Sequence, residues 1–174
     1  MARSSISPTG KEVFFDPDDV IVSKTDAKGK LVYANDVFLS IAGYREGEVL
    51  GQPHNMIRHP DMPRSVFAVL WETIQSGREI FAYVKNMTKS GDHYWVLAHV
   101  TPSRDAAGSI VGFHSNRRVP SRSAIEQVEP LYGEMRRAEI AAAGPREAIA
   151  AGKEVLQRAL DAAGKSYAAF IFSI

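Results

Sequence analysis

The chain has 174 residues, of which 45% are hydrophobic and 24% charged, and its net charge is +1. This length and composition predict one globular domain with some additional helix. The small net charge gives no bulk attraction to nucleic acid or to an anionic membrane surface. Because the chain contains no cysteine, disulfides, thiolate metal sites and cysteine nucleophiles are excluded. No apolar run approaches the ~20 residues of a membrane-spanning helix, so we expect a cytoplasmic chain without direct membrane insertion.

Strands and helices are both predicted in the first 120 residues. Two short β-branched runs joined by a turn at Gly29 predict a hairpin, and three longer runs predict an antiparallel meander. The predicted strands are residues 20–25, 31–34, 80–87, 93–102 and 109–119. Between hairpin and meander we expect a short helix at 37–42, several proline-limited turns, and a helix at 64–75 with apolar residues at helical spacing. This order predicts an α+β fold in which helices cover one face of an antiparallel sheet.

The composition changes after Pro120, where the chain becomes rich in alanine with balanced charges. This segment predicts helices with a break at the Gly144-Pro145 pair. Pro130 interrupts the apolar stripe of the first helix, which predicts either a kink or a helix start at that point. Helices this short are marginal alone, so we expect them to pack on the sheet or to pair with a second copy. The predicted divisions are an N-terminal cap (1–17), a central domain (18–120) and a C-terminal helical extension (121–174).

Four motifs resemble the PAS domain of bacterial aerotaxis receptors. They are Tyr33-Ala-Asn35-Asp-Val-Phe38 followed by Ala42-Gly-Tyr44, Gly51-Gln-Pro-His-Asn-Met-Ile-Arg-His-Pro-Asp-Met-Pro63, Lys85-Asn86 with Ser90-Gly-Asp-His-Tyr-Trp95, and Glu129-Pro-Leu-Tyr132. The resemblance covers roughly residues 18–133, and the second motif is the most specific. It implies the PAS fold, a five-stranded antiparallel sheet with short helices on one face, followed here by the C-terminal helices.

The resemblance also implies a function. The family's domain binds FAD without covalent attachment, and the flavin's redox state follows oxygen or electron transport and is relayed to chemotaxis signalling. We therefore expect a sensor and not an enzyme, a homodimer formed through the sheet and flanking helices, and a downstream signalling domain or protein. The sequence itself contains no glycine-rich phosphate loop and no acid–base carboxylate pair at helical spacing. Tethering to a membrane within a longer parent protein stays open.

Eight residues are candidates for contact with the cofactor: Asn35, Arg58, His59, Asp61, Trp71, Asn86, Tyr94 and Trp95. Arg58 offers a planar fork of donors for phosphate oxygens, and His59 can donate to a phosphate or ribose. The ring of Trp71, on the apolar face of the helix at 64–75, can contact the flavin or fill the core. Asparagine is disfavoured in strands, so we expect Asn86 to present its amide to the flavin edge. A redox change would then alter that hydrogen bond, move the sheet and shift the C-terminal helices.

The remaining candidates have structural alternatives. Asn35 can cap the helix at 37–42, and Asp61 can cap the helix at 64–75. Side-chain alternation places Tyr94 and Trp95 on opposite faces of the strand at 93–102, and either one can be a core residue.

Other cofactor states remain open. In the family, the strand before Lys85-Asn86 opens with Pro-Trp and a small residue, whereas this chain has Glu79-Ile80-Phe81. If that tryptophan helps to hold the flavin, either Phe81 or Tyr83 replaces it here or the affinity for flavin is lower. Other PAS families hold haem through one axial histidine. The histidines available for this are His54, His59 and His93. The third alternative is a cofactor-free PAS module for dimerisation or interaction.

Overall fold

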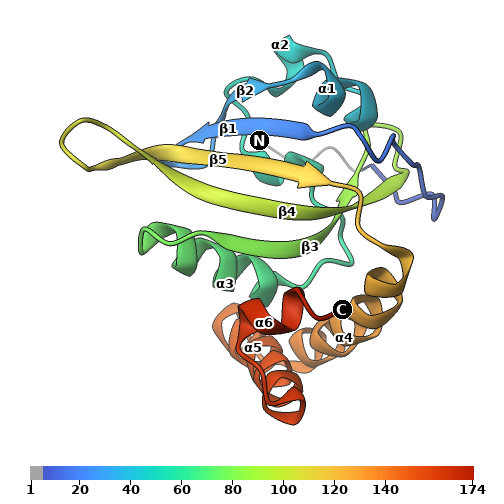
Figure 1. Cartoon of the computed structure of the whole chain (residues 1–174). Coiled ribbons are helices and arrows are strands. Elements are labelled where there is room, and N and C mark those ends of the chain that lie inside the picture. The colour runs from blue at the N-terminus through green and yellow to red at the C-terminus, as the bar shows by residue number, and fades with distance from the viewer. Residues whose placement is uncertain (1–5) are drawn as a thin grey trace.

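The computed structural model describes residues 6–174 and has one antiparallel sheet at its centre (Figure 1). Its strands are β1 (Ile21–Asp26), β2 (Leu31–Ala34), β3 (Ile80–Met87), β4 (His93–Arg104) and β5 (Ile110–Arg118), in the spatial order β2-β1-β5-β4-β3. Gly29 has φ +79° at the β1–β2 turn, a conformation that glycine adopts without steric cost. The predicted α+β fold with a five-stranded antiparallel sheet is confirmed.

Short helices fill the chain between β2 and β3 and lie on one side of the sheet. They are α1 (Asp36–Ala42), α2 (Glu46–Val49), the 3₁₀ helix η1 (His54–Ile57) and α3 (Arg64–Gln75). The buried residues of α3, which include Val66, Leu70 and Ile74, recur at helical spacing and face the sheet. The core therefore sits between this helical layer and one face of the sheet.

Residues 51–62, which we call the crossing segment, run from one edge of the sheet to the other. At the β2 edge, the Gly51 amide donates to the Leu31 carbonyl (2.7 Å) and the Leu31 amide donates to Gln52 (2.8 Å). At the β3 edge, Arg58 forms an antiparallel bridge with Asn86. The segment therefore pairs with both outer strands, which would otherwise present free backbone groups to other chains.

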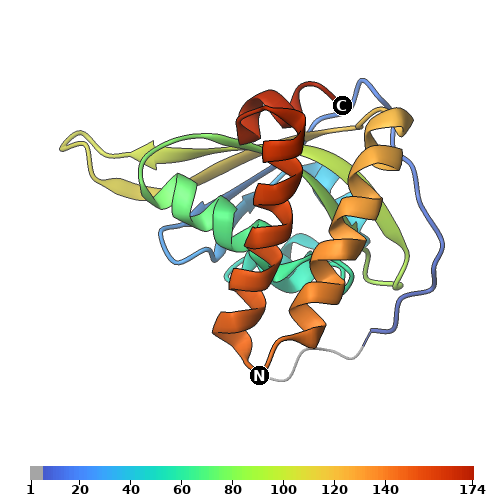
Figure 2. The same cartoon turned by 90° about the horizontal axis from the view of Figure 1, so that it is seen from below.

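Three helices follow the sheet and pack below it (Figures 1 and 2). They are α4 (Arg122–Ala141), α5 (Pro145–Ala163) and α6 (Tyr167–Ile171). Helix α5 packs against α3 and α4, and α6 contacts β3. Helix α4 begins after Ser121, whose Oγ accepts from the Ala124 amide (3.1 Å), and continues through Pro130. Of the predicted alternatives, a helix start at Pro130 is therefore wrong. Within residues 6–174, no helix is long and apolar enough to span a bilayer.

The N-terminal segment lies along the start of β4. The Val13 amide donates to the His93 carbonyl, and the His93 amide donates to Lys11, both at 2.8 Å. Phe15 packs edge-on against Tyr94, with ring centroids 6.4 Å apart, whereas Phe14 is 70% exposed. Residues 1–5 of the predicted N-terminal cap lie outside the described residues.

Candidate functional site

A pocket lies between the sheet and the helical layer, and its volume is about 180 Å³. The β1–β2 hairpin, the crossing segment, α3 and the inward faces of β3, β4 and β5 form its walls. Its lining residues are Ser23, Thr25, Lys28, Gly29, Pro53, His54, Asn55, Ile57, Arg58, Phe67, Leu70, Trp71, Ile74, Val84, Asn86, Ala98, Val100, Phe113, Ser115 and Arg117. Apolar side chains make up most of the α3 wall, and polar side chains come mainly from the strands and the crossing segment. The pocket therefore combines a slot for an apolar ring with a polar wall.

The polar wall contains donors and acceptors that the protein leaves unused. Among residues 6–174, four lining side chains have a buried atom without a hydrogen-bond partner. These atoms are Thr25 Oγ1, Asn86 Nδ2, Ser115 Oγ and Arg117 Nη1. A buried polar group without a partner costs about 1–3 kcal/mol. The arrangement therefore fits a bound molecule whose polar edge supplies the missing partners.

Arg117 is a cation enclosed at this wall. It is only 3% exposed, and its Nη2 donates to Ser23 Oγ (2.7 Å) and to His54 Nε2 (2.5 Å). Burial lowers the pKa of Arg117 from 12.5 to about 10. No carboxylate lies within ion-pair distance of it among the described residues. The guanidinium therefore remains charged at neutral pH and gives the pocket an uncompensated positive charge.

The contact with Arg117 fixes the state of His54. Since a guanidinium can only donate, His54 Nε2 must accept, and the imidazole is neutral with its proton on Nδ1. Burial, together with the charge of Arg117, lowers the pKa of His54 to about 3. The histidine therefore stays neutral throughout the physiological range.

Two other predicted site residues, Arg58 and Trp71, also line the pocket. Arg58 donates from Nη2 to the Met62 carbonyl (3.1 Å), and its guanidinium carbon lies 4.3 Å from the centroid of Phe67. Trp71 meets Phe113 edge-on, with centroids 5.4 Å apart. A Cβ at Gly29 would lie 2.9 Å from the indole of Trp71. The indole therefore packs between the β1–β2 turn and the sheet. With Asn86, three of the eight predicted residues meet at this pocket.

Asn35 lies outside the pocket lining and has a structural role. Its Oδ1 accepts from the amides of Val22 and Phe38, both at 3.0 Å, and its Nδ2 donates to the Val20 carbonyl (2.8 Å). It caps α1 and ties that helix to β1. Of its two predicted roles, the structure shows the cap.

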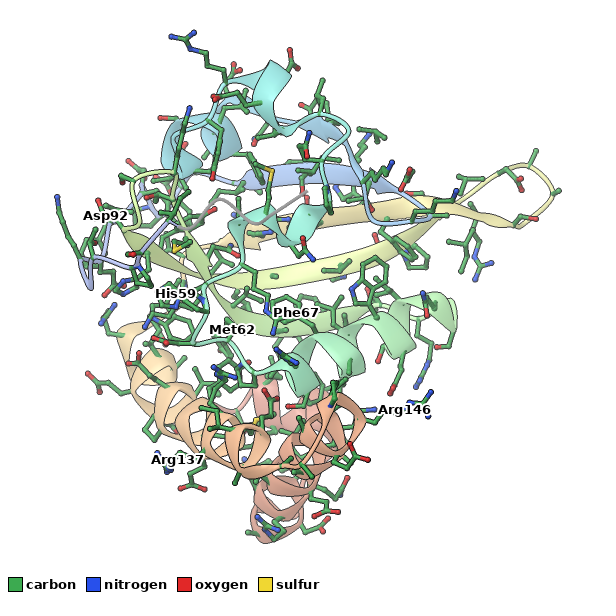
Figure 3. The ribbon with its side chains drawn as sticks, turned by 180° about the vertical axis from the view of Figure 1, so that it is seen from behind. His59, Met62, Phe67, Asp92, Arg137 and Arg146 are labelled. Carbon is green, nitrogen blue, oxygen red and sulfur yellow. The ribbon has the colours of Figure 1, made fainter. Side chains whose placement is uncertain are left out.

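His59 and Asp61 also lie outside the pocket, next to α4 and the β3 edge. Figure 3 shows His59 and Met62 on the segment that leads from the sheet to α3. His59 is 3% exposed, its Nδ1 accepts from the Asp61 amide (3.1 Å), and burial lowers its pKa to about 4. The Asp61 side chain is 69% exposed and lies 3.7 Å from Lys85 Nζ. No side chain caps α3 from its own N-terminal residues, so the capping alternative for Asp61 is wrong.

Tyr94 and Trp95 occupy opposite faces of β4, as alternation predicts. Tyr94 is fully buried on the inner face but does not line the pocket, and burial raises the pKa of its hydroxyl. The charge of Arg117 and the adjacent Asn86 amide oppose this rise in pKa, although the hydroxyl has no hydrogen bond of good geometry within residues 6–174. Trp95 faces outward, and its ring centroid lies 6.3 Å from that of Tyr132 on α4.

The two residues expected to replace the family's tryptophan also face away from the pocket. Phe81 stacks on His99 with centroids 4.1 Å apart, and the hydroxyl of Tyr83 donates to the Ile171 carbonyl (3.2 Å). Neither lines the pocket, because both occupy the outward positions of β3. Of the two alternatives, replacement by Phe81 or Tyr83 is therefore not supported by their positions. Of the two tryptophans in the sequence, Trp71 lines the pocket.

Sequence reasoning missed Arg117, Ser115 and Thr25. The available signal was the alternation along β5, where Phe113, Ser115 and Arg117 share the inward phase. Two polar residues in phase with a buried phenylalanine indicate a polar cavity inside the core.

Comparisons with known proteins agree with this geometry. A family model described as the PAS fold matches residues 31–117. The chain therefore belongs to the PAS family, and the resemblance predicted from its motifs is confirmed.

Individual proteins of known sequence or structure are similar to this chain. The aerotaxis receptor of Escherichia coli strain K12 is 44% identical over 115 residues, which are 66% of this chain and 22% of that protein. The biofilm dispersion protein BdlA of Pseudomonas aeruginosa is 31% identical over 100 residues, 57% of this chain and 22% of that protein. A structure of the light state of the blue-light photoreceptor Aureochrome1 LOV has a TM-score of 0.56 and 26% identity, over 62% of this chain and 86% of that chain. The chain thus spans less than a quarter of the two relatives' own length.

Proposed function

We propose that the pocket holds the isoalloxazine ring of FAD non-covalently and that the protein is a redox or oxygen sensor of the energy-taxis type. The observation that carries this proposal is the set of unpartnered polar atoms around Arg117 on the wall of an otherwise apolar slot. The similarity to an aerotaxis receptor and to a LOV photoreceptor structure supports the same class of ligand. A bound flavin supplies a reversible redox centre.

Different residues of the pocket would bind different parts of FAD. Asn86 and Ser115 offer hydrogen bonds to the polar edge of the ring, and Arg117 favours negative charge on that edge. Trp71 supplies an aromatic wall. Lys28 is an exposed lining residue and Arg58 a half-buried one, so cationic groups stand where the pocket opens and suit a pyrophosphate. The residues present therefore fit FAD.

The state of His54 favours flavin over haem. An axial histidine must offer a free ring nitrogen to the iron. Nε2 of His54, the one histidine in the lining, already accepts from a cationic guanidinium. A metal cation at that nitrogen would displace the hydrogen bond and face the charge of Arg117.

The remaining parts of the proposal concern signalling. We propose that the chain is a cytoplasmic sensor without catalytic activity, forms a homodimer, and passes its signal to a downstream domain or protein. The C-terminal extension (121–174) would serve that relay.

The first experiment is an absorption spectrum of the purified protein, followed by heat release of any chromophore. A two-band yellow spectrum that is bleached by dithionite and released on heating is the expected result. A Soret band would replace flavin with haem, and a colourless protein that does not take up added FAD would refute cofactor binding. Asn86→Leu should weaken FAD binding at least tenfold, whereas Asn116→Leu, on the outward phase of β5, should not.

A further inference from the structure

A buried carboxylate on α4 holds the start of α3. Glu139 is 5% exposed and accepts hydrogen bonds from the Arg64 amide (3.0 Å), the Ser65 amide (2.8 Å) and Ser65 Oγ (2.7 Å). Helix α3 begins after Pro63, without a side-chain cap and without an acidic residue in its first turn. The free amides at the start of a helix need acceptors and favour negative charge. A residue from the C-terminal helices therefore supplies the cap that α3 lacks.

Helix α5 approaches Ser65 and Glu139 closely through Gly152. A Cβ at Gly152 would lie 2.3 Å from Ser65 Oγ and 2.9 Å from Glu139 Oε1, so only glycine allows α5 this approach. We call the contact among Ser65, Glu139 and Gly152 the three-helix junction. It joins α3, α4 and α5 around the Glu139 carboxylate, which also lies 3.5 Å from Arg136 Nη1 on α4.

The other side of α3 forms a wall of the pocket through Phe67, Leu70, Trp71 and Ile74. One helix therefore faces the pocket on one side and the three-helix junction at its N-terminus. A second wall, β3, shows the same arrangement. Val84 and Asn86 face the pocket, while the Tyr83 carbonyl accepts from Tyr132 of α4 (2.8 Å). The C-terminal helices are thus attached to two pocket walls.

We propose that Glu139 is a positioning residue that couples the pocket to the docking of α4 and α5. A change inside the pocket displaces α3, and the displacement acts on the hydrogen bonds at Glu139. Because leaving a buried charge without its partners is strongly destabilising, loss of these hydrogen bonds weakens the docking of α4 and α5 on α3. Only the identity of the ligand in this coupling rests on the proposed FAD function.

The test is hydrogen exchange of the α5 amides, expressed relative to the β5 amides so that global unfolding cancels. In the ligand-free protein, Leu70→Ala on the α3 wall should raise the α5 exchange rate at least threefold. Val100→Ala, on the β4 wall of the same pocket, is the matched control and should not. Glu139→Gln should raise the α5 rate at least tenfold and abolish the effect of Leu70→Ala, while Glu134→Gln on the exposed side of α4 should do neither.

The FAD-loaded protein gives a second readout. Dithionite reduction should change the α5 rate at least threefold in the parent chain and in Glu134→Gln, but not in Glu139→Gln. If Glu139→Gln does not fold, Gly152→Ala places a methyl group in the same junction from α5 and replaces it.

The outcomes separate the two proposals. Unchanged α5 exchange in Leu70→Ala, or equal effects of Leu70→Ala and Val100→Ala, would overturn the coupling whether or not FAD binds. Failure to bind FAD, with the Leu70 effect intact and dependent on Glu139, would refute the proposed function and support the coupling.

Discussion

Replacing Arg117 with methionine should show whether this residue contributes mainly to ligand affinity or to the stability of the fold. The pKa of Arg117 falls from 12.5 to about 10 on burial, which at ~1.4 kcal/mol per tenfold change makes its charged form about 3 kcal/mol less favourable. The variant loses hydrogen bonds from a charged guanidinium to Ser23 and His54, each worth about 1.5 kcal/mol. The two effects nearly cancel, so the ligand-free variant should unfold within about 1 kcal/mol of the parent or at a higher free energy.

FAD affinity, in contrast to the stability of the ligand-free protein, should fall. Loss of a buried cation beside the ring edge should weaken FAD binding at least tenfold, or about 1.4 kcal/mol. The reduced cofactor carries more negative charge, so its binding should weaken further. Each additional tenfold loss lowers the midpoint potential of a two-electron couple by about 30 mV.

Urea unfolding with and without FAD, together with a redox titration, measures both effects. Arg118→Met, an exposed substitution on the opposite face of β5, is the control and should leave affinity and potential unchanged. A ligand-free Arg117→Met protein that is more than about 2 kcal/mol less stable, yet binds FAD normally, would show that Arg117 serves the fold and refute this reasoning.

Three further predictions concern single residues. The folded-state pKa of His54 is about 3, below its unfolded value near 6.5, so the unfolded chain binds the extra proton and stability falls as pH drops below ~6.5. His59 and His93 are shifted in the same direction, so His54→Gln should reduce the loss of unfolding free energy between pH 7.5 and 5.5 by about 1 kcal/mol without removing it, as urea unfolding would show. Gly29→Ala places a methyl group 2.9 Å from Trp71 at φ +79° and should lower the melting temperature and the FAD affinity together, whereas Gly108→Ala, at φ +83° with no atom within 4 Å, should lower only the former. Tyr132→Phe removes the bond to the Tyr83 carbonyl, and calorimetry should show a loss of about 1–3 kcal/mol, with an unchanged melting curve contradicting the contact.

Local sequence patterns were sufficient to predict the sheet. The residues that form β1 and β3 are rich in β-branched and aromatic side chains, and turn residues bound them. The predicted span 80–87 coincides with β3. The meander also follows from short connections, since sequential strands joined by tight turns pair antiparallel. These features depend on residues that are close together in the sequence, so one sequence is sufficient to predict them.

The site was predicted only in part, because its members come together through the fold. Asn86 could be predicted, since an amide inside a strand needs an explanation. Alternation groups Arg117 with Phe113 and Ser115 and separates it from Arg118, but which of the two groups meets α3 is decided by the fold. His59 belongs to the most specific motif, yet the crossing segment directs its side chain toward His93 (ring centroids 5.7 Å apart) and not into the pocket. A motif marks a segment as important, but register and strand pairing decide where each side chain points.

The crossing segment has a consequence for how a bound molecule enters and leaves. It is fastened by backbone hydrogen bonds to β2 at one end and β3 at the other, and His54, Asn55, Ile57 and Arg58 in its span line the pocket. The distance between its fastenings is set by the width of the sheet. The pocket therefore cannot widen on this side unless one end detaches from an outer strand. The rate at which a bound molecule leaves on this side would then depend on how readily one end detaches. Substitutions at the two ends of the crossing segment would change the residence time, whereas substitutions in the pocket lining would change the equilibrium affinity.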